Sequence, residues 1–130
     1  MFRKSNSVKA LDLSQQEITT IIGHSFAITG DLNGNEVIRI DGKVNGNVMV
    51  TKGVILGEHS IVDGDIETQN AIIYGRVNGN IKTSQLEIKK TGEINGDIKT
   101  GTLEVELGAK YNGKLEMKPS PQKETGKTEQ

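Results

Sequence analysis

The chain has 130 residues, a net charge of -1 at pH 7 and no cysteine. This length suits one modest domain, and the lack of thiols excludes disulfide bridges and thiolate metal sites. The near-neutral charge argues against electrostatic binding of nucleic acid, so we expect no nucleic-acid partner. No apolar run approaches the roughly 20 residues of a membrane span, and the N-terminus lacks the apolar core of a signal peptide, which together predict a cytoplasmic protein.

Residues 1–17 are predicted to form a flexible tail with a membrane-targeting tip. The tail opens with Met1 and Phe2, an apolar pair, followed by the cations Arg3 and Lys4. Such a pairing suits shallow insertion into a bilayer together with attraction to anionic lipid. An ordinary disordered terminus is the alternative. We expect the tip to hold the protein at the inner face of the cytoplasmic membrane.

Residues 18–117 contain an internal repeat. An aliphatic residue or tyrosine, a polar residue, glycine, a polar residue and an aliphatic residue recur around Gly30, Gly46, Gly64, Gly79, Gly96 and Gly113. Successive glycines are separated by 16, 18, 15, 17 and 17 residues. Aliphatic side chains alternate with polar ones between the glycines, as in Leu103–Leu107, which is the period of a strand with one buried face. The repeat predicts an all-β protein built from short strands.

A coil of such strands explains the repeat better than a series of hairpins. Asn-Gly often forms a hairpin turn, but here aliphatic residues lie two positions from the glycine on both sides. A period of about 17 residues suits one turn of a single-stranded, three-sided β-helix, a solenoid of about six turns. Stacked turns would bury a narrow column of Val, Ile and Leu, which agrees with the aromatic content of only 3%. The aliphatic residues do not keep a strict six-residue rhythm, which favours a right-handed coil.

Both ends of this β-helix are predicted to be open for self-association. No amphipathic capping helix is evident before Ile18 or after Met117, and an uncapped sheet edge is prone to pair with another. At the N-terminal end the predicted interface is Ile21, Ile22, Phe26 and Ile28. At the C-terminal end it is Leu107, Tyr111, Leu115 and Met117. The alternative is that these residues only fill the terminal layers.

Two other sets of residues are tempting as sites. His24 and His59 occupy equivalent positions two turns apart, about 10 Å at the spacing of paired strands, which predicts corner residues rather than a shared metal site. Asn or Asp residues flank the repeated glycines, and we interpret them as turn and side-chain ladder residues rather than as calcium ligands. They are Asn45, Asn47, Asp63, Asp65, Asn78, Asn80, Asn95 and Asp97. No cofactor and no metal ion are expected.

Residues 118–130 are polar and contain the only two prolines, Pro119 and Pro121. This composition predicts a disordered tail. A solubilising spacer is the simpler interpretation, and recruitment of a partner is the alternative.

The repeat region resembles the bactofilins, a family of bacterial polymer-forming cytoskeletal proteins. The recurring Val/Ile-Asn/Asp-Gly-Asn/Asp-Val/Ile unit, its spacing and the polar, proline-bearing tail carry the resemblance over about Ile18 to Met117. It implies a right-handed β-helix, polymerisation without nucleotide into non-polar filaments, and a short N-terminal segment that binds the cytoplasmic membrane. It also implies a role in cell shape or polar organisation, often beside peptidoglycan-modifying enzymes, and a polymer contact made by a bulky C-terminal aromatic residue, here Tyr111.

Two further functions stay open at this point. One is a hexapeptide-repeat acyltransferase that uses His24 or His59 as a base, although such enzymes have more coils and a substrate loop. The other is a monomeric adaptor that binds a partner through a flat face of the β-helix. The leading prediction is a structural protein, not an enzyme, that polymerises with itself at the membrane and scaffolds cell-shape or cell-wall machinery.

Overall fold

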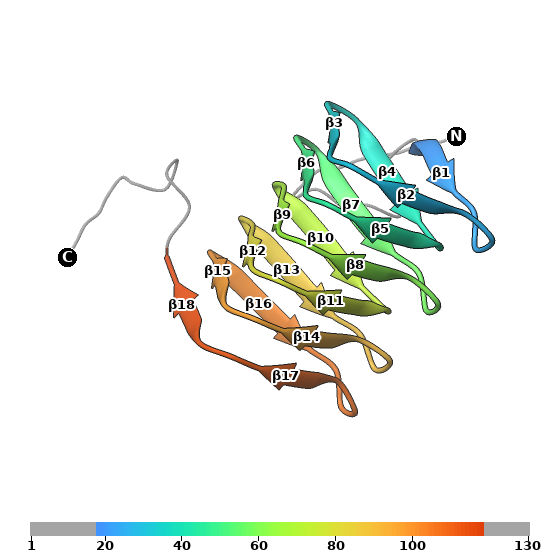
Figure 1. The fold of residues 1–130 in the computed structure, drawn as a ribbon. Helices are drawn as coiled ribbons and strands as arrows, with labels where there is room; N and C mark the ends of the chain where they lie inside the picture. Colours follow the sequence, from blue (N-terminus) through green and yellow to red (C-terminus); the bar gives the residue numbers. More distant parts are fainter. Residues whose placement is uncertain (1–17, 119–130) are drawn as a thin grey trace, which may run out of the picture.

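The computed structural model describes residues 18–118, which form three parallel six-stranded sheets (Figure 1). The first sheet contains β1 (Ile18–Ile22), β4 (Val37–Ile40), β7 (Gly53–Leu56), β10 (Asn70–Ile73), β13 (Gln85–Ile88) and β16 (Thr102–Val105). The second contains β2 (Ala27–Thr29), β5 (Lys43–Asn45), β8 (Ile61–Asp63), β11 (Arg76–Asn78), β14 (Glu93–Asn95) and β17 (Lys110–Asn112). The third contains β3 (Leu32–Gly34), β6 (Val48–Val50), β9 (Ile66–Glu67), β12 (Ile81–Lys82), β15 (Ile98–Thr100) and β18 (Leu115–Met117).

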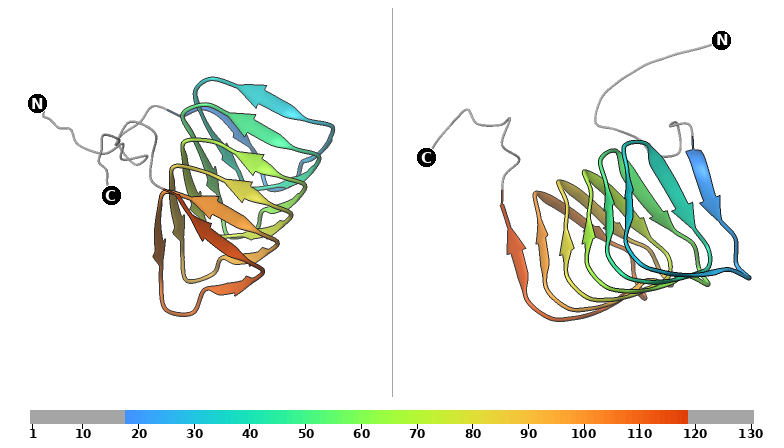
Figure 2. Two further views of the ribbon diagram at one scale, coloured as in Figure 1. Left: turned by 90° about the vertical axis from the view of Figure 1, so that its left-hand side faces the viewer. Right: turned by 45° about the horizontal axis from the view of Figure 1, so that its top comes forward.

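Each turn of the chain contributes one strand to each sheet, and every strand pairs with its equivalent in the next turn (Figure 2). Ile81, for example, is the register partner of Ile66 on one side and of Ile98 on the other. The predicted all-β, three-sided solenoid of six turns is therefore confirmed. The right-handed sense stays a prediction, and it is the sense that nearly all parallel crossover connections take.

The core is a set of stacked aliphatic columns along the solenoid axis. In the second sheet, Val44, Val62, Val77 and Ile94 occupy one column and are completely buried. Each side chain packs against its equivalents above and below, so a single turn could not bury its own apolar face. The interior is narrow, and this explains why the inner turns use Val, Ile and Leu rather than rings.

The repeated glycines form a backbone stack at the corner between the second and third sheets. At Gly96, φ is +150°, and a side-chain Cβ there would overlap the carbonyl oxygen of Gly79 in the preceding turn. The Gly96 amide donates to the Asn112 carbonyl in the following turn at 2.9 Å. Glycine is therefore required here both by its backbone conformation and by the closeness of the next turn.

Two ladders of polar side chains run beside this glycine stack, as predicted. In the first, a side-chain oxygen accepts a hydrogen bond from a backbone amide one turn further on, as Asp65 does from Asn80 and Asn80 does from Asp97. In the second, the Asn78 amide group donates to Asp63, and the Asn95 amide group donates to Asn78. The Asn and Asp residues of the repeat thus join successive turns.

The predicted 10 Å separation of His24 and His59 is wrong, because their ring centroids lie 5.3 Å apart in an edge-to-face arrangement. Both residues lie in four-residue corners, 23–26 and 57–60, as the prediction of corner positions requires. The turn between them has only Asp41 and Gly42 at this corner. The two longer loops therefore meet across the shorter one.

Candidate functional site

The last turn leaves an apolar layer at the C-terminal end of the solenoid. Five inward side chains of this turn form what is here called the C-terminal end layer: Leu103, Val105, Tyr111, Leu115 and Met117. Their register partners in the preceding turn are all buried, and they are, in the same order, Leu86, Ile88, Ile94, Ile98 and Thr100. In residues 18–118 no further turn stacks on the C-terminal end layer. Leu115 consequently retains 43% and Met117 49% exposure.

Tyr111 continues the column of Val62, Val77 and Ile94 and replaces their aliphatic side chains with a ring. Its hydroxyl donates to the backbone carbonyl of Lys114. Burial and the nearby negative charge of Asp97 raise the pKa of Tyr111, while a hydrogen bond with the Ile98 backbone opposes them. The side chain is therefore positioned in its neutral form as part of the terminal layer.

The N-terminal end is a second apolar layer, made by the first turn. Ile22, Ile28 and Leu32, here called the N-terminal end layer, are the register partners of the buried Ile40, Val44 and Val48. Phe26 lies beside them in the corner before β2 and is 68% exposed. Two strand edges of each sheet, at its first and last turns, are unpaired within the described part of the chain.

The predicted interface residues divide into three groups. Ile22 and Ile28 lie in the N-terminal end layer, and Tyr111, Leu115 and Met117 lie together in the C-terminal one. Ile21 instead lies on the outer face of the first sheet, paired with Arg39. Phe26 and Leu107 lie in corner loops, and Leu107 is 91% exposed.

Sequence reasoning missed three members of the end layers, which are Leu32, Leu103 and Val105. The repeat contained the signal that would have found the last two. Leu103 and Val105 follow Leu86 and Ile88 by one period of 17 residues, and both pairs are in register. Leu32 is likewise the first residue of the column that continues through Val48.

The family profile described as "Bactofilin: Polymer-forming cytoskeletal" matches residues 20–116. The chain belongs to the bactofilin family. The family resemblance noted in the sequence is thereby confirmed, and the matched segment coincides with the six-turn solenoid. The two open ends are accordingly the ends of a domain from a polymer-forming cytoskeletal family.

Two curated relatives are bactofilins of Myxococcus xanthus (strain DK1622). This chain is 41% identical to bactofilin BacO over 71 residues, which is 54% of this chain and 56% of the relative. It is 31% identical to bactofilin BacP over 87 residues, which is 66% of this chain and 36% of the relative. The aligned segments thus cover about half or less of the length of these two relatives.

Two solved bactofilin structures share the fold. A cryo-EM reconstruction of double helical filaments of Thermus thermophilus bactofilin superposes with a TM-score of 0.69 at 28% identity, over 74% of this chain and 98% of the other. The cytoskeletal bactofilin BacA, determined by solid-state NMR, gives a TM-score of 0.69 at 29% identity, over 77% of this chain and 96% of the other. The superposition thus covers nearly the whole of each of these two solved chains.

Several predictions fall partly or wholly outside this structure. The membrane-targeting tip, Met1 to Lys4, and the tail beyond residue 118 lie outside the described residues. Lys118, placed in the tail by the sequence, still donates its backbone amide to the Thr100 carbonyl at 2.8 Å. Within residues 18–118 we find no helix long and apolar enough to cross a membrane. The same residues include no group of three or more His, Cys, Asp or Glu that could hold a metal ion.

Proposed function

We propose that this bactofilin assembles with itself, end to end and without nucleotide, into filaments. The observation that carries the proposal is the pair of end layers, on which no further turn stacks and whose strand edges are unpaired within residues 18–118. Leu115 and Met117 in the C-terminal layer are partly exposed, whereas Ile22 in the N-terminal layer is only 8% exposed. Covering the end layers removes apolar area from water and pairs free backbone groups. The filaments of the Thermus thermophilus relative support this use of the fold.

We infer that each end layer contacts the same end layer of a second subunit, because the two layers of one subunit differ in composition. The C-terminal end layer contains Tyr111 and Met117. In the first turn, Thr20 pairs with the buried Ile38 and so shares the inward face with the aliphatic N-terminal end layer, and Phe26 lies at its margin. A contact between two identical surfaces is closed by a two-fold axis, and alternating two such contacts produces a filament without polarity. In such a filament the C-terminal end layer needs to fit only a second C-terminal end layer, and the N-terminal end layer only a second N-terminal one.

Electron microscopy of the purified chain tests the proposal. Negative staining in buffer that contains no nucleotide is expected to show filaments. A well-defined trimer would favour the acyltransferase alternative, and a monomer at all concentrations would favour the adaptor. Either of these two results would refute polymerisation.

The second part of the proposal is attachment of the filaments to the inner face of the cytoplasmic membrane through Met1, Phe2, Arg3 and Lys4. One tip would bind weakly, but a filament presents many tips, so that avidity multiplies the affinity. Replacing Phe2→Ser together with Lys4→Ser is expected to release the protein from vesicles that contain phosphatidylglycerol, as measured by co-sedimentation. Lys43→Ser, which removes one positive charge from the side of the solenoid, should leave the binding unchanged. Continued co-sedimentation of the Phe2/Lys4 variant would contradict this attachment.

A cytoplasmic, membrane-attached filament would act as a scaffold rather than as an enzyme. It would hold peptidoglycan-modifying enzymes, or their membrane anchors, at chosen places and thereby influence cell shape. The repeated register of the solenoid supports this role, because a partner that recognises one subunit would find the same surface at regular intervals along the filament.

A further inference from the structure

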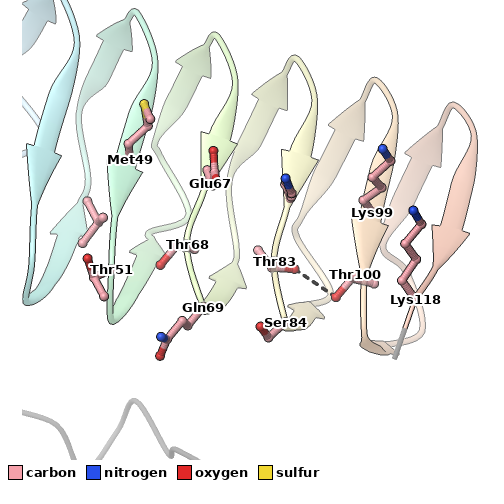
Figure 3. A pocket seen from close by; sticks show the side chains of 12 residues that line it. Met49, Thr51, Glu67, Thr68, Gln69, Thr83, Ser84, Lys99, Thr100 and Lys118 are labelled. Carbon is pink, nitrogen blue, oxygen red and sulfur yellow. Dashed lines mark hydrogen bonds between the residues drawn. The ribbon is translucent and has the colours of Figure 1, made fainter. Parts of the chain in front are cut away.

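A groove runs along the side of the solenoid at the corner between the third and first sheets (Figure 3). It has a volume of about 520 Å³ and extends from Met49 in β6, across β9, β12 and β15, to Lys118. It is thus parallel to the axis and crosses several turns. It lies on the side of the rod and meets the C-terminal end layer only at its last turn, where Lys118 follows Met117. A ligand could therefore occupy the rest of it in a single chain or in a filament.

The floor of the groove is polar, unlike the other inward columns. Thr68, Thr83 and Thr100 occupy inward positions on three successive turns and are all buried. The Thr83 hydroxyl donates to that of Thr100 at 2.9 Å (Figure 3). Thr100 in turn donates to the Thr102 carbonyl at 2.8 Å. The Thr68 hydroxyl has no hydrogen-bond partner within residues 18–118, although the residue is only 7% exposed.

An unpaired buried hydroxyl is costly, because it loses its hydrogen bonds to water and gains none in return. Valine has nearly the same shape as threonine and occupies the equivalent column at Val50, where it is buried. The interior therefore does not require a hydroxyl at this column. Thr68 is among the residues that line the groove, but its hydroxyl oxygen has almost no exposed surface, so a ligand would meet it only after the side chain rotates.

The rim of the groove has two lysines without a partner. Lys82 and Lys99 are register partners on the outer positions of β12 and β15. No carboxylate lies within 4.0 Å of either ammonium group in the described part of the chain, whereas Lys118 has Glu116 at 3.4 Å. Glu67 is the register partner of Lys82 on its other side, and Glu116 is that of Lys99. The groove lining nevertheless has three lysines, Lys82, Lys99 and Lys118, and one carboxylate, Glu67, so it has an excess of positive charge that favours an anionic ligand.

We propose that this lysine–threonine groove binds an extended, acidic segment of a partner polypeptide. Alternate side chains of an extended peptide lie about 6.6–6.8 Å apart on one face, and the flexible stems of Lys82 and Lys99 can match carboxylates at that spacing. The peptide backbone offers both N–H and C=O groups to the Thr68 hydroxyl. A flat bilayer could reach the lysines but not the recessed threonines, and this favours a polypeptide over a membrane. The inference does not depend on polymerisation.

A binding assay with a simple acidic peptide tests the groove. The probe is a fluorescein-labelled peptide of alternating glutamate and threonine, and its affinity for the full chain is measured by fluorescence anisotropy. Lys82→Gln combined with Lys99→Gln is expected to weaken binding at least ten-fold. The matched control, Lys43→Gln with Lys90→Gln, removes the same charge from other parts of the solenoid and should bind as the unmodified chain does.

Three outcomes would overturn the proposal. One is an equal loss of affinity in the control variant, because binding would then depend only on net charge. A second is unchanged binding when glutamine replaces every glutamate in the probe. A third is that the Lys82/Lys99 variant loses binding to phosphatidylglycerol vesicles but keeps its affinity for the peptide, which would assign the lysines to a membrane.

Thr68→Val separates a ligand contact from a structural role. The variant loses no hydrogen bond within residues 18–118, so its thermal midpoint is expected to be unchanged or raised. Its affinity for the glutamate–threonine peptide should nevertheless fall several-fold. Unchanged affinity would show that the hydroxyl does not meet the ligand, and the argument from the buried threonine would fail.

Discussion

Gly96→Ala is expected to lower the free energy of unfolding by about 3–5 kcal/mol, a large fraction of the stability of a typical domain. The new methyl group would overlap the carbonyl oxygen of Gly79, which belongs to backbone and not to a flexible side chain. At a φ of +150° the alanine is also strained. Relief would require the turns to separate, and that would break the hydrogen bond from the Gly96 amide to Asn112.

Gly34→Ala is the matched control for this experiment. A Cβ at Gly34 would meet no atom within 4 Å, and its effect on stability should stay within about 0.5 kcal/mol. Urea unfolding followed by far-ultraviolet circular dichroism compares the two variants. If both unfold at the same urea concentration as the unmodified chain, the close stacking of glycines is not what holds successive turns in register.

The sequence was sufficient for the architecture because the repeat encodes it at every turn. Each glycine marks the same corner, and each aliphatic residue two positions away belongs to a column of stacked side chains. Polar ladders could be predicted as well, since Asn and Asp beside glycine recur with the same period. An architecture determined by many equivalent positions tolerates an irregular spacing such as the 15 residues from Gly64 to Gly79.

The repeat does not predict distances between residues in the corner loops, because the length of these loops differs from turn to turn. An average rise per turn places His24 and His59 too far apart, because it ignores the short corner at Asp41 and Gly42 between them. The alternating pattern of Leu103–Leu107 likewise predicts a strand that reaches Leu107, whereas the strand ends at Val105 and Leu107 lies in the loop that follows.

The lysine–threonine groove was not found in the sequence for a different reason. Threonine is a common strand residue, so Thr68, Thr83 and Thr100 gave no sign of being inward. Their burial follows from the register of the third sheet, in which inward and outward positions alternate from Ile66, Ile81 and Ile98. Only three-dimensional stacking brings the three hydroxyls into one column beside Lys82 and Lys99.

Leu115→Arg is expected to abolish the proposed filaments while leaving the solenoid folded. Leu115 is 43% exposed in the single chain, so an arginine there can extend its guanidinium group into water. In an end-to-end contact the same group would be buried without a partner, at a cost of roughly 3–5 kcal/mol. This corresponds to a loss of more than a hundred-fold in affinity at that contact. Tyr111→Arg should act in the same way.

Met49→Arg is the control for this variant, since Met49 is similarly exposed at 47% but lies on the side of the solenoid. Its filaments should persist in negative-stain images, and those of Leu115→Arg should be absent. Unchanged filaments in Leu115→Arg would refute the C-terminal end layer as a contact.

The size of the remaining particles then identifies the second contact. If like ends meet, Leu115→Arg should leave dimers joined through their N-terminal end layers, measurable by light scattering. Adding Phe26→Arg should convert these dimers to monomers, because Phe26 lies beside Ile22 and Ile28 at that end. If the C-terminal end instead meets the N-terminal end of the next subunit, Leu115→Arg alone would already give monomers. Contact between like ends would then be refuted, and the filament would have a polarity.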